Sequence, residues 1–385
     1  MTTVANRSTV TWGTNRTAGS VSVQRLADTA ENRQKLQAQA AKDKLPSAVV
    51  DLGADVALLS GAALETASRI ARTQGPVIAK GGKVQVDSAN ADVLFTDDGF
   101  SEIEASDIVV AVIDSGLDVN HPAFAGRVVK PYNTMTGTTD VTDKNSHGTH
   151  CAGIIAGAAT EGSVGVASQV KIMPIKAGDG SFTSADIVKG IRYAADNGAK
   201  VISMSLGGKG QLPEVQKAVQ YAQSKGCVVV AATGNDGKNT VSFPAYYEDI
   251  LSVGSSKDGK RSSFSNGGDR LDVSAPGEAI NSTVPGGGYG KKSGTSMATP
   301  YVAGAIALVM AQHPEWTPSE VKNHMKRAVN DLGAPGWDKD FGYGEVNLFK
   351  AVYGENLPEV PRSSTPAPSK PSGGFLAWVK RLFGG

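Results

Sequence analysis

The chain has 385 residues, of which 40% are hydrophobic and 19% are charged, a composition typical of a globular protein with a substantial core. Its 38 basic and 37 acidic residues leave a formal charge of +1, which argues against nucleic acid as a partner. Only two cysteines occur, so there is no disulfide framework, and we expect both to be buried free thiols.

The first 100 residues differ from the rest in composition and in their expected secondary structure. Residues 1–45 are polar, and they predict a disordered start up to about residue 22, followed by a solvated helix over residues 25–44. Residues 46–100 predict a small α+β unit in front of the main domain. Its expected helix covers residues 62–71, and its expected strands cover residues 48–52, 76–79 and 83–86.

From residue 107 the chain alternates apolar strands with helices. Residues 108–113 form a continuous apolar run, the pattern of a parallel strand buried on both faces. This alternation predicts an α/β fold over residues 101–354, with three layers: a central, mostly parallel sheet flanked by helices on both sides. The other expected strands cover 170–175, 201–204, 228–232 and 250–253, and the expected helices cover 147–158, 184–197 and 213–225.

Beyond the main sheet the composition changes again. Thr317 and Glu320 form a capping box that begins a helix ending near residue 328. Residues 355–373 are rich in Pro and Ser and predict a linker. Residues 374–385 form a short tail whose apolar residues share one helical face. The tail is too short to span a membrane, so it suits weak docking on a membrane surface or on a protein.

The expected location rests on the polar N-terminus. Residues 1–20 contain no apolar run that could act as a signal peptide, which predicts a cytoplasmic protein. Export by a non-standard route is the alternative. No run elsewhere approaches the length needed to cross a bilayer.

Polar residues interrupt the α/β pattern at functionally suggestive places. Asp114 follows the first buried strand, at the end where open α/β sheets bind ligands, although a turn residue is equally consistent. His147 opens a helix of small apolar residues. His150 shares its face, so a metal pair is an alternative, although no third ligand cluster lies nearby in sequence.

Ser296 begins an apolar helix, where it could be a cap or a nucleophile. A hydroxyl becomes a good nucleophile when an imidazole takes its proton and a carboxylate orients that imidazole, and His147 and Asp114 supply these groups. Asn235 follows the strand over residues 228–232, so its amide could donate to an oxyanion; an ordinary Asn-Asp-Gly turn is the alternative.

These motifs resemble those of the subtilisin-like serine proteases, the subtilase family. The resemblance implies a three-layer subtilisin-like fold and a serine endopeptidase that works through an acyl-enzyme. It also implies that Asp114 orients His147, that His147 is the general base and acid, that Ser296 attacks, and that Asn235 and the Ser296 backbone N–H form the oxyanion hole. The matching segments are Ala-Val-Ile-Asp-Ser-Gly at 111–116, His-Gly-Thr-His-Cys-Ala-Gly at 147–153, Ser-Leu-Gly-Gly at 205–208, Ala-Thr-Gly-Asn at 232–235 and Gly-Thr-Ser-Met-Ala-Thr-Pro at 294–300.

The resemblance further implies a peptide or protein substrate, bound in extended form between two edge segments. A pocket for the residue before the cut is expected beside them. Many family members have Gly where this chain has Ser242, whose hydroxymethyl group should shorten that pocket and disfavour bulky aromatic side chains. The substrate-binding residues implied in this way are Gly180, Ser181, Ser205, Leu206, Gly207, Ala232, Gly234 and Ser242.

The chain departs from the family in its expected calcium site. Secreted subtilisins commonly hold calcium with a carboxylate after His-Pro and with an Asn-rich loop. Here Ala123 follows His-Pro, and residues 159–163 read Ala-Thr-Glu-Gly-Ser. We therefore expect no required cofactor and no metal ligands of that tight site. Calcium binding elsewhere, through Glu161, Asp140 or Asp143, stays open.

Two further questions are left open by the sequence. Residues 46–100 stand where a zymogen carries its inhibitory pro-segment, and a permanent accessory module is the alternative. The competing function is a catalytically silent binding protein on a subtilase fold, against which the four intact catalytic positions argue. We expect a monomer.

Overall fold

The computed structural model describes residues 7–12, 19–27, 47–51, 55–60, 103–157 and 165–353, with side chains from residue 103 onward. Several predictions lie outside these residues: the helix over 62–71, the strands over 76–79 and 83–86, the loop over 159–163, the linker over 355–373 and the tail over 374–385.

The N-terminal residues form an antiparallel sheet in the order β1-β2-β4-β3. The prediction of disorder up to residue 22 is therefore wrong over residues 7–12 and 19–22, and that of a helix from residue 25 is wrong over residues 25–27. The rest of that predicted helix, residues 28–44, lies outside the described residues. Alternating Val with Thr or Ser favours a strand here, a pattern that the polar composition concealed. The strand expected over 48–52 is confirmed. The four strands are β1 (Arg7–Trp12), β2 (Gly19–Ala27), β3 (Ser47–Asp51) and β4 (Asp55–Ser60).

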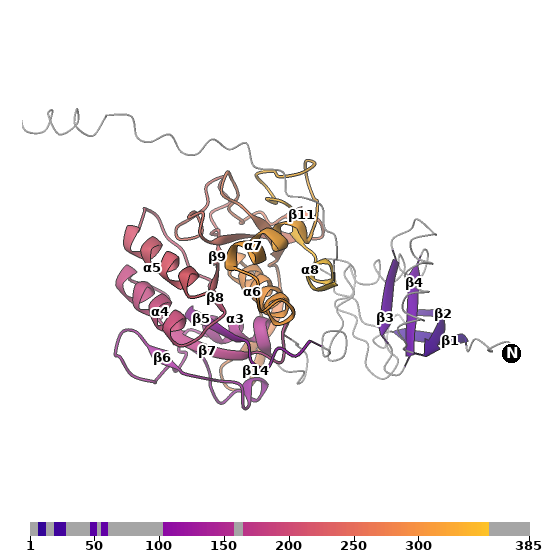
Figure 1. The fold of residues 1–385 in the computed structure, drawn as a ribbon, viewed down its shortest axis with the longest axis horizontal. Helices are drawn as coiled ribbons and strands as arrows, with labels where there is room; N and C mark the ends of the chain where they lie inside the picture. Colours follow the sequence, from indigo (N-terminus) through magenta and orange to yellow (C-terminus); the bar gives the residue numbers. More distant parts are fainter. Residues whose placement is uncertain are drawn as a thin grey trace, which may run out of the picture.

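The main sheet is mostly parallel and has the order β15-β16-β12-β10-β9-β8-β5-β7-β6, with β11 paired to β10. Figure 1 labels β9, β8, β5, β7 and β6, which form one end of this order. Only the pairs β15–β16 and β10–β11 are antiparallel within it. The strands expected from residue 108 onward are confirmed to within one residue at their starts. The strands are β5 (Val109–Asp114), β6 (Tyr132–Asn133), β7 (Lys171–Lys176), β8 (Val201–Met204), β9 (Val228–Ala232), β10 (Leu251–Lys257), β11 (Lys260–Arg261), β12 (Val273–Pro276), β15 (Val329–Asn330) and β16 (Glu345–Val346).

Helices cover both faces of this sheet, as the α/β alternation predicted. In β5, Val110 and Val112 pack into the core beneath α3 (His147–Ala156) and α6 (Thr295–Gln312). Ala111 and Ile113 point to the opposite face, into the core under α4 (Ser184–Asp196) and α5 (Pro213–Ser224). Because a fully buried Val or Ile contributes about 1.5–3 kcal/mol, burial on both faces explains the unbroken apolar run.

Shorter elements complete this unit. The capping box of Thr317 and Glu320 is confirmed at the start of α7 (Pro318–Arg327). A hairpin of β13 (Ile280–Val284) and β14 (Gly288–Lys292) runs directly into α6. The remaining elements are η1 (Pro122–Phe124) and α8 (Leu348–Tyr353). Among the described helices, none combines the length and apolar character needed to cross a membrane.

Candidate active site

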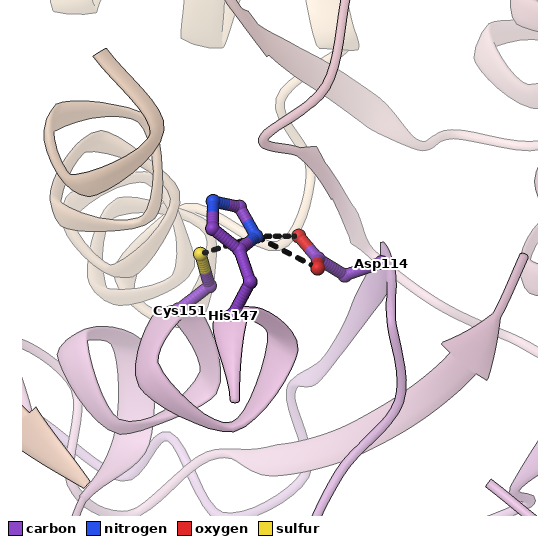
Figure 2. Close-up of side chains that lie close together, drawn as sticks. All are labelled: Asp114, His147 and Cys151. Carbon is purple, nitrogen blue, oxygen red and sulfur yellow. Dashed lines mark hydrogen bonds and ion pairs between the residues drawn. The ribbon is translucent and has the colours of Figure 1, made fainter. Parts of the chain in front are cut away.

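Asp114 and His147 meet where β5 ends and α3 begins. His147 Nδ1 lies 2.8 Å from Asp114 Oδ1 and 3.0 Å from Oδ2 (Figure 2). The carboxylate is buried, and the imidazole side chain is 26% exposed. The backbone N–H of Ser115 also donates to Oδ1, at 2.6 Å, and this second hydrogen bond helps to fix the orientation of the carboxylate. Nδ1 therefore carries a proton toward Asp114, and Nε2 is left as the basic nitrogen.

Two glycines allow this strand and this helix to approach so closely. A Cβ placed on Gly148 would lie 2.2 Å from the carbonyl oxygen of Gly116, which no real side chain tolerates. Gly116 itself has φ +122°, a conformation that favours glycine. The glycines of Asp-Ser-Gly and His-Gly-Thr are thus required for the Asp114–His147 contact.

Cys151 lies one helical turn after His147 and is fully buried. Its Sγ is 3.9 Å from His147 Nδ1. A thiolate at Cys151 and the carboxylate of Asp114 would both raise the pKa of His147, whereas burial lowers it. Burial also raises the pKa of the Cys151 thiol, which keeps its proton at neutral pH. The lasting negative charge beside the imidazole is therefore the Asp114 carboxylate.

The metal-pair alternative for His147 and His150 does not fit the structure. His150 is buried, and its Nε2 donates to the carbonyls of Ile280 and Gly290, at 3.1 and 3.0 Å. Burial lowers its pKa to about 4, so it is a neutral core histidine. In the described part of the chain, one potential metal-ligand group includes His147, formed with Asp114 and Cys151 within 4.8 Å. The hydrogen bonds among those three residues already account for their closeness.

Ser296 lies in the first turn of α6 and is partly exposed. Its Oγ donates to the carbonyl of Ser205 at 3.3 Å. Its own carbonyl would bond the N–H four residues later, but that residue is Pro300, which has none. Ser205 Oγ at 2.8 Å and Cys151 Sγ at 3.4 Å donate to this free carbonyl instead. Cys151 therefore touches both the Ser296 backbone and the imidazole of His147.

The hydroxyl of Ser296 has a different partner from the expected one. Among the described residues, its hydrogen bond goes to Ser205, with none to His147. A serine hydroxyl changes rotamer about a single bond, so it can exchange this partner without a movement of the backbone. Apo active sites commonly show such loose contacts.

Asn235 is fixed by the residue before Ser296. Its Oδ1 accepts hydrogen bonds from the backbone N–H of Thr295 at 2.9 Å and from the Thr295 hydroxyl at 3.0 Å. With the oxygen held in this way, the amide Nδ2 is left free to donate. Asn235 is exposed beyond the end of β9, and Thr295 is buried. Thr295, which the sequence did not single out, therefore positions the amide that is predicted to donate to an oxyanion.

The expected pocket residues come together beside β9. A Cβ on Gly207 would lie 3.4 Å from Ser242 Cβ and 3.8 Å from the carbonyl oxygen of Ala232. A Cβ on Gly234 would lie 2.5 Å from both Ser242 Oγ and Asn266 Nδ2. Asn266 is buried and accepts hydrogen bonds from the backbone of the 236–238 turn, so it fixes this wall.

The two expected edge segments differ in how closely the structure ties them to the site. Ser205 bonds Ser296 directly, and Leu206 beside it is buried. Gly180 and Ser181 form an exposed turn closed by a bridge between Gly178 and Phe182. Asn145, two residues before His147, donates from Nδ2 to the carbonyl of Asp179 in this turn at 3.4 Å.

The side chain of Arg127 bears on the calcium prediction. Its guanidinium donates to the carbonyls of Ala156 and Ser168, both at 2.5 Å, and to that of Ala123. A fixed cation therefore bonds the segment after His-Pro and both sides of the loop over 159–163. Ala123 offers no carboxylate, and the loop over 159–163 lies outside the described residues, so the absence of the tight calcium site stays a prediction.

Sequence reasoning undervalues three polar residues around the site: Asp143, Thr295 and Asn266. The sequence suggests Asp143 only as a calcium ligand, yet both its oxygens accept hydrogen bonds from within the protein. Thr295 stands inside the Gly-Thr-Ser motif, which is a usable signal. Asn266 lies in a Ser-Asn-Gly-Gly run that predicts no more than a turn.

The fold and this constellation define an α/β protein with a serine, a histidine and an aspartate at the ends of neighbouring elements. Comparison with known proteins agrees. Residues 105–344 match the model of the subtilase family. Thermitase from Thermoactinomyces vulgaris is 42% identical over 65% of this chain and 90% of its own length. Subtilisin from Bacillus pumilus is 41% identical over 64% and 91%.

Solved structures show the same likeness. The S41 psychrophilic protease is 31% identical, with a TM-score of 0.60, over 65% of this chain and 97% of that one. Sphericase is 32% identical, with a TM-score of 0.59, over 62% and 90%. The chain belongs to the subtilase family, and it is a subtilisin-like serine endopeptidase.

Proposed function

We propose that this endopeptidase cleaves peptide bonds through Asp114, His147, Ser296 and Asn235. The observation that carries the proposal is the Asp114–His147 hydrogen bond of 2.8 Å at the start of α3, the helix whose Cys151 contacts the Ser296 backbone. It leaves Nε2 of the imidazole as the basic nitrogen. Catalysis by this arrangement needs no cofactor.

In this mechanism His147 Nε2 takes the proton of the Ser296 hydroxyl as its oxygen attacks the scissile carbonyl carbon. The Asp114 carboxylate stabilises the imidazolium that forms. The carbonyl oxygen becomes an oxyanion, and it accepts hydrogen bonds from Asn235 Nδ2 and the Ser296 backbone N–H. His147 then protonates the leaving amine, and the peptide C–N bond breaks to give an acyl-enzyme. Water, deprotonated by His147, releases the acid and restores Ser296.

The N-terminal end of α6 adds to oxyanion stabilisation. The helix begins at Thr295 and is buried along nearly its whole length, so its position is rigid. Its positive end and the Ser296 N–H face the point where negative charge develops. The apolar residues of this helix thereby anchor the nucleophile and the dipole together.

Ser242 sets the size of the first specificity pocket in this proposal, because its hydroxymethyl group stands against Gly207 and Gly234. Wild type should cleave after Ala or Leu better than after Phe. Ser242→Gly should raise kcat/KM for the Phe peptide by about 10-fold, the scale of one extra methylene-sized space, and change the Ala peptide little. Peptides that differ only at this residue measure the effect. A clear wild-type preference for Phe would contradict it.

We also propose that residues 46–100 are a pro-segment, removed by cleavage within residues 88–100. The support is their place directly before the matched family region, which begins at residue 105. N-terminal sequencing of the purified active protein tests this. A mature chain that begins before residue 46 would favour a permanent accessory module.

The experiment that tests the catalytic proposal is labelling with a fluorophosphonate probe, which bonds an activated serine. Wild type should be labelled, and Ser296→Ala should not. Ser263→Ala, which removes an exposed serine, is the matched control and should be labelled like wild type. If wild type stays unlabelled after cleavage within residues 88–100, the silent binding protein becomes the better interpretation.

A further inference from the structure

We propose that Asp143 is a positioning residue that holds His147 in register with Asp114. This inference rests on the proposed mechanism, because it assigns Asp143 an effect on the catalytic pair. Asp143 is 6% exposed and lies in the loop that leads from β6 to α3. It touches no reacting atom, and its contacts join the two elements that carry the pair.

The first set of contacts fixes the start of α3. The N-cap of this helix is Ser146, which has φ 71° and makes no capping hydrogen bond with its side chain. Asp143 serves as the cap instead. Its Oδ1 accepts from the N–H of Asn145 at 3.0 Å and of Ser146 at 2.9 Å, and its Oδ2 accepts from the N–H of Thr149 at 2.9 Å. One carboxylate thus holds the backbone on both sides of His147.

The second contact reaches the end of β5. Ser115 Oγ donates to Asp143 Oδ1 at 2.9 Å and accepts from the N–H of Gly148 at 2.9 Å. The backbone N–H of Ser115 donates to Asp114 Oδ1. Ser115 therefore connects Asp143, the residue after His147 and the catalytic carboxylate. Any shift of the helix start relative to the strand must break one of these bonds.

The contacts require a carboxylate rather than an amide. The fifth donor is the Thr149 hydroxyl, 2.6 Å from Oδ2, so both oxygens accept and neither donates. Backbone N–H groups face each oxygen, and they cannot turn around. An amide side chain at this position would therefore set its NH₂ against a backbone N–H in either orientation. Burial raises the pKa of Asp143, but the hydrogen bonds from Thr149 and Ser115 outweigh it and lower the pKa, so the group is ionised.

The contacts of Asp143 also bear on the pKa of His147, because they hold the imidazole beside the Asp114 carboxylate. Loosening that contact should lower the pKa of the imidazole. Because His147 must be neutral to act as a base, the acid limb of the pH profile should then move to lower pH. Among the described residues, Asp114 of β5 and Cys151 of α3 contact the imidazole directly, and His150 lies on the same helix. Two lysines bond the residues next to the pair: Lys292 Nζ of β14 donates to Ser146 Oγ, and Lys176 Nζ of β7 donates to the Ser115 carbonyl.

Asp143→Asn tests the proposal, with Asp140→Asn as the control, since Asp140 is an exposed carboxylate in the same loop. We expect Asp143→Asn to lower kcat about 10- to 100-fold, the loss that a misplacement near 1 Å causes, with KM little changed. The acid limb of kcat/KM should shift to lower pH. Asp140→Asn should match wild type in all three quantities. A role confined to stability would lower the melting temperature and leave the acid limb in place.

Ser115→Ala keeps the test decisive if Asp143→Asn does not fold. It removes the link between Asp143 and β5 but leaves the backbone N–H that donates to Asp114. We expect the same direction of change, with a smaller loss of kcat. The proposal is overturned if folded Asp143→Asn, or failing that Ser115→Ala, has wild-type kcat and pH profile. Failure of the catalytic proposal looks different, because wild type itself would then neither bind the fluorophosphonate nor cleave peptides.

Discussion

Replacing Asp114 with Asn should lower kcat about 10⁴-fold while the fold is retained. Both carboxylate oxygens lie within 3.0 Å of His147 Nδ1, so the NH₂ of the substituted amide would face this nitrogen in either orientation. The imidazole would then accept through Nδ1 and carry its proton on Nε2. In that tautomer Nε2 has no lone pair for the Ser296 hydroxyl, and the general base is lost.

The same substitution predicts a shift in pH dependence. The Asp114 carboxylate is the charge that keeps the His147 pKa raised beside a protonated Cys151. Without it the pKa falls, so the acid limb of the residual activity should lie at lower pH than in wild type. Steady-state kinetics across pH measure both effects. Asp107→Asn is the control, because it makes the same charge change at an exposed residue just before β5. A residual kcat within 10-fold of wild type would contradict the assignment of Asp114.

The main sheet was predictable because its strands are buried on both faces. A short, unbroken apolar run such as 108–113, with turn residues on either side, fits few structures other than a strand buried on both faces. The N-terminal sheet was not predictable in the same way. Its strands β1 and β2 mix Thr, Ser and Arg with Val, so composition favoured disorder although the alternation suits a strand.

The candidate site was also predictable only in part. Asp114, His147 and Ser296 belong to the few residue types that can form a nucleophile, a base and an orienting carboxylate, so the sequence could suggest all three together. Their supports act through backbone groups and contacts distant in sequence. Asp143 reaches Ser115 across 28 positions, and Asn235 is held by Thr295 across 60. No local pattern encodes such a contact, because it arises only when the sheet brings the strand ends together.

Replacing Asn235 with Ala should lower kcat about 10²- to 10³-fold, the effect of removing the corresponding asparagine in subtilisin, with KM nearly unchanged. In the proposed mechanism the amide donates to an oxygen that is charged only in the transition state, so substrate binding should not depend on it. The structure supports a preorganised donor, because Thr295 holds Oδ1 through both its N–H and its hydroxyl.

Steady-state kinetics on one peptide substrate separate kcat from KM for this variant. Asn239→Ala is the matched control, since it removes an exposed amide in the same loop whose partner is Arg261. It should leave both constants unchanged. Thr295→Val should reproduce part of the Asn235 defect, because it removes one of the two donors that orient Oδ1 while keeping the helix start. If Asn235→Ala instead raised KM at constant kcat, the amide would bind the substrate in its ground state, and the oxyanion hole would have to consist of backbone donors alone.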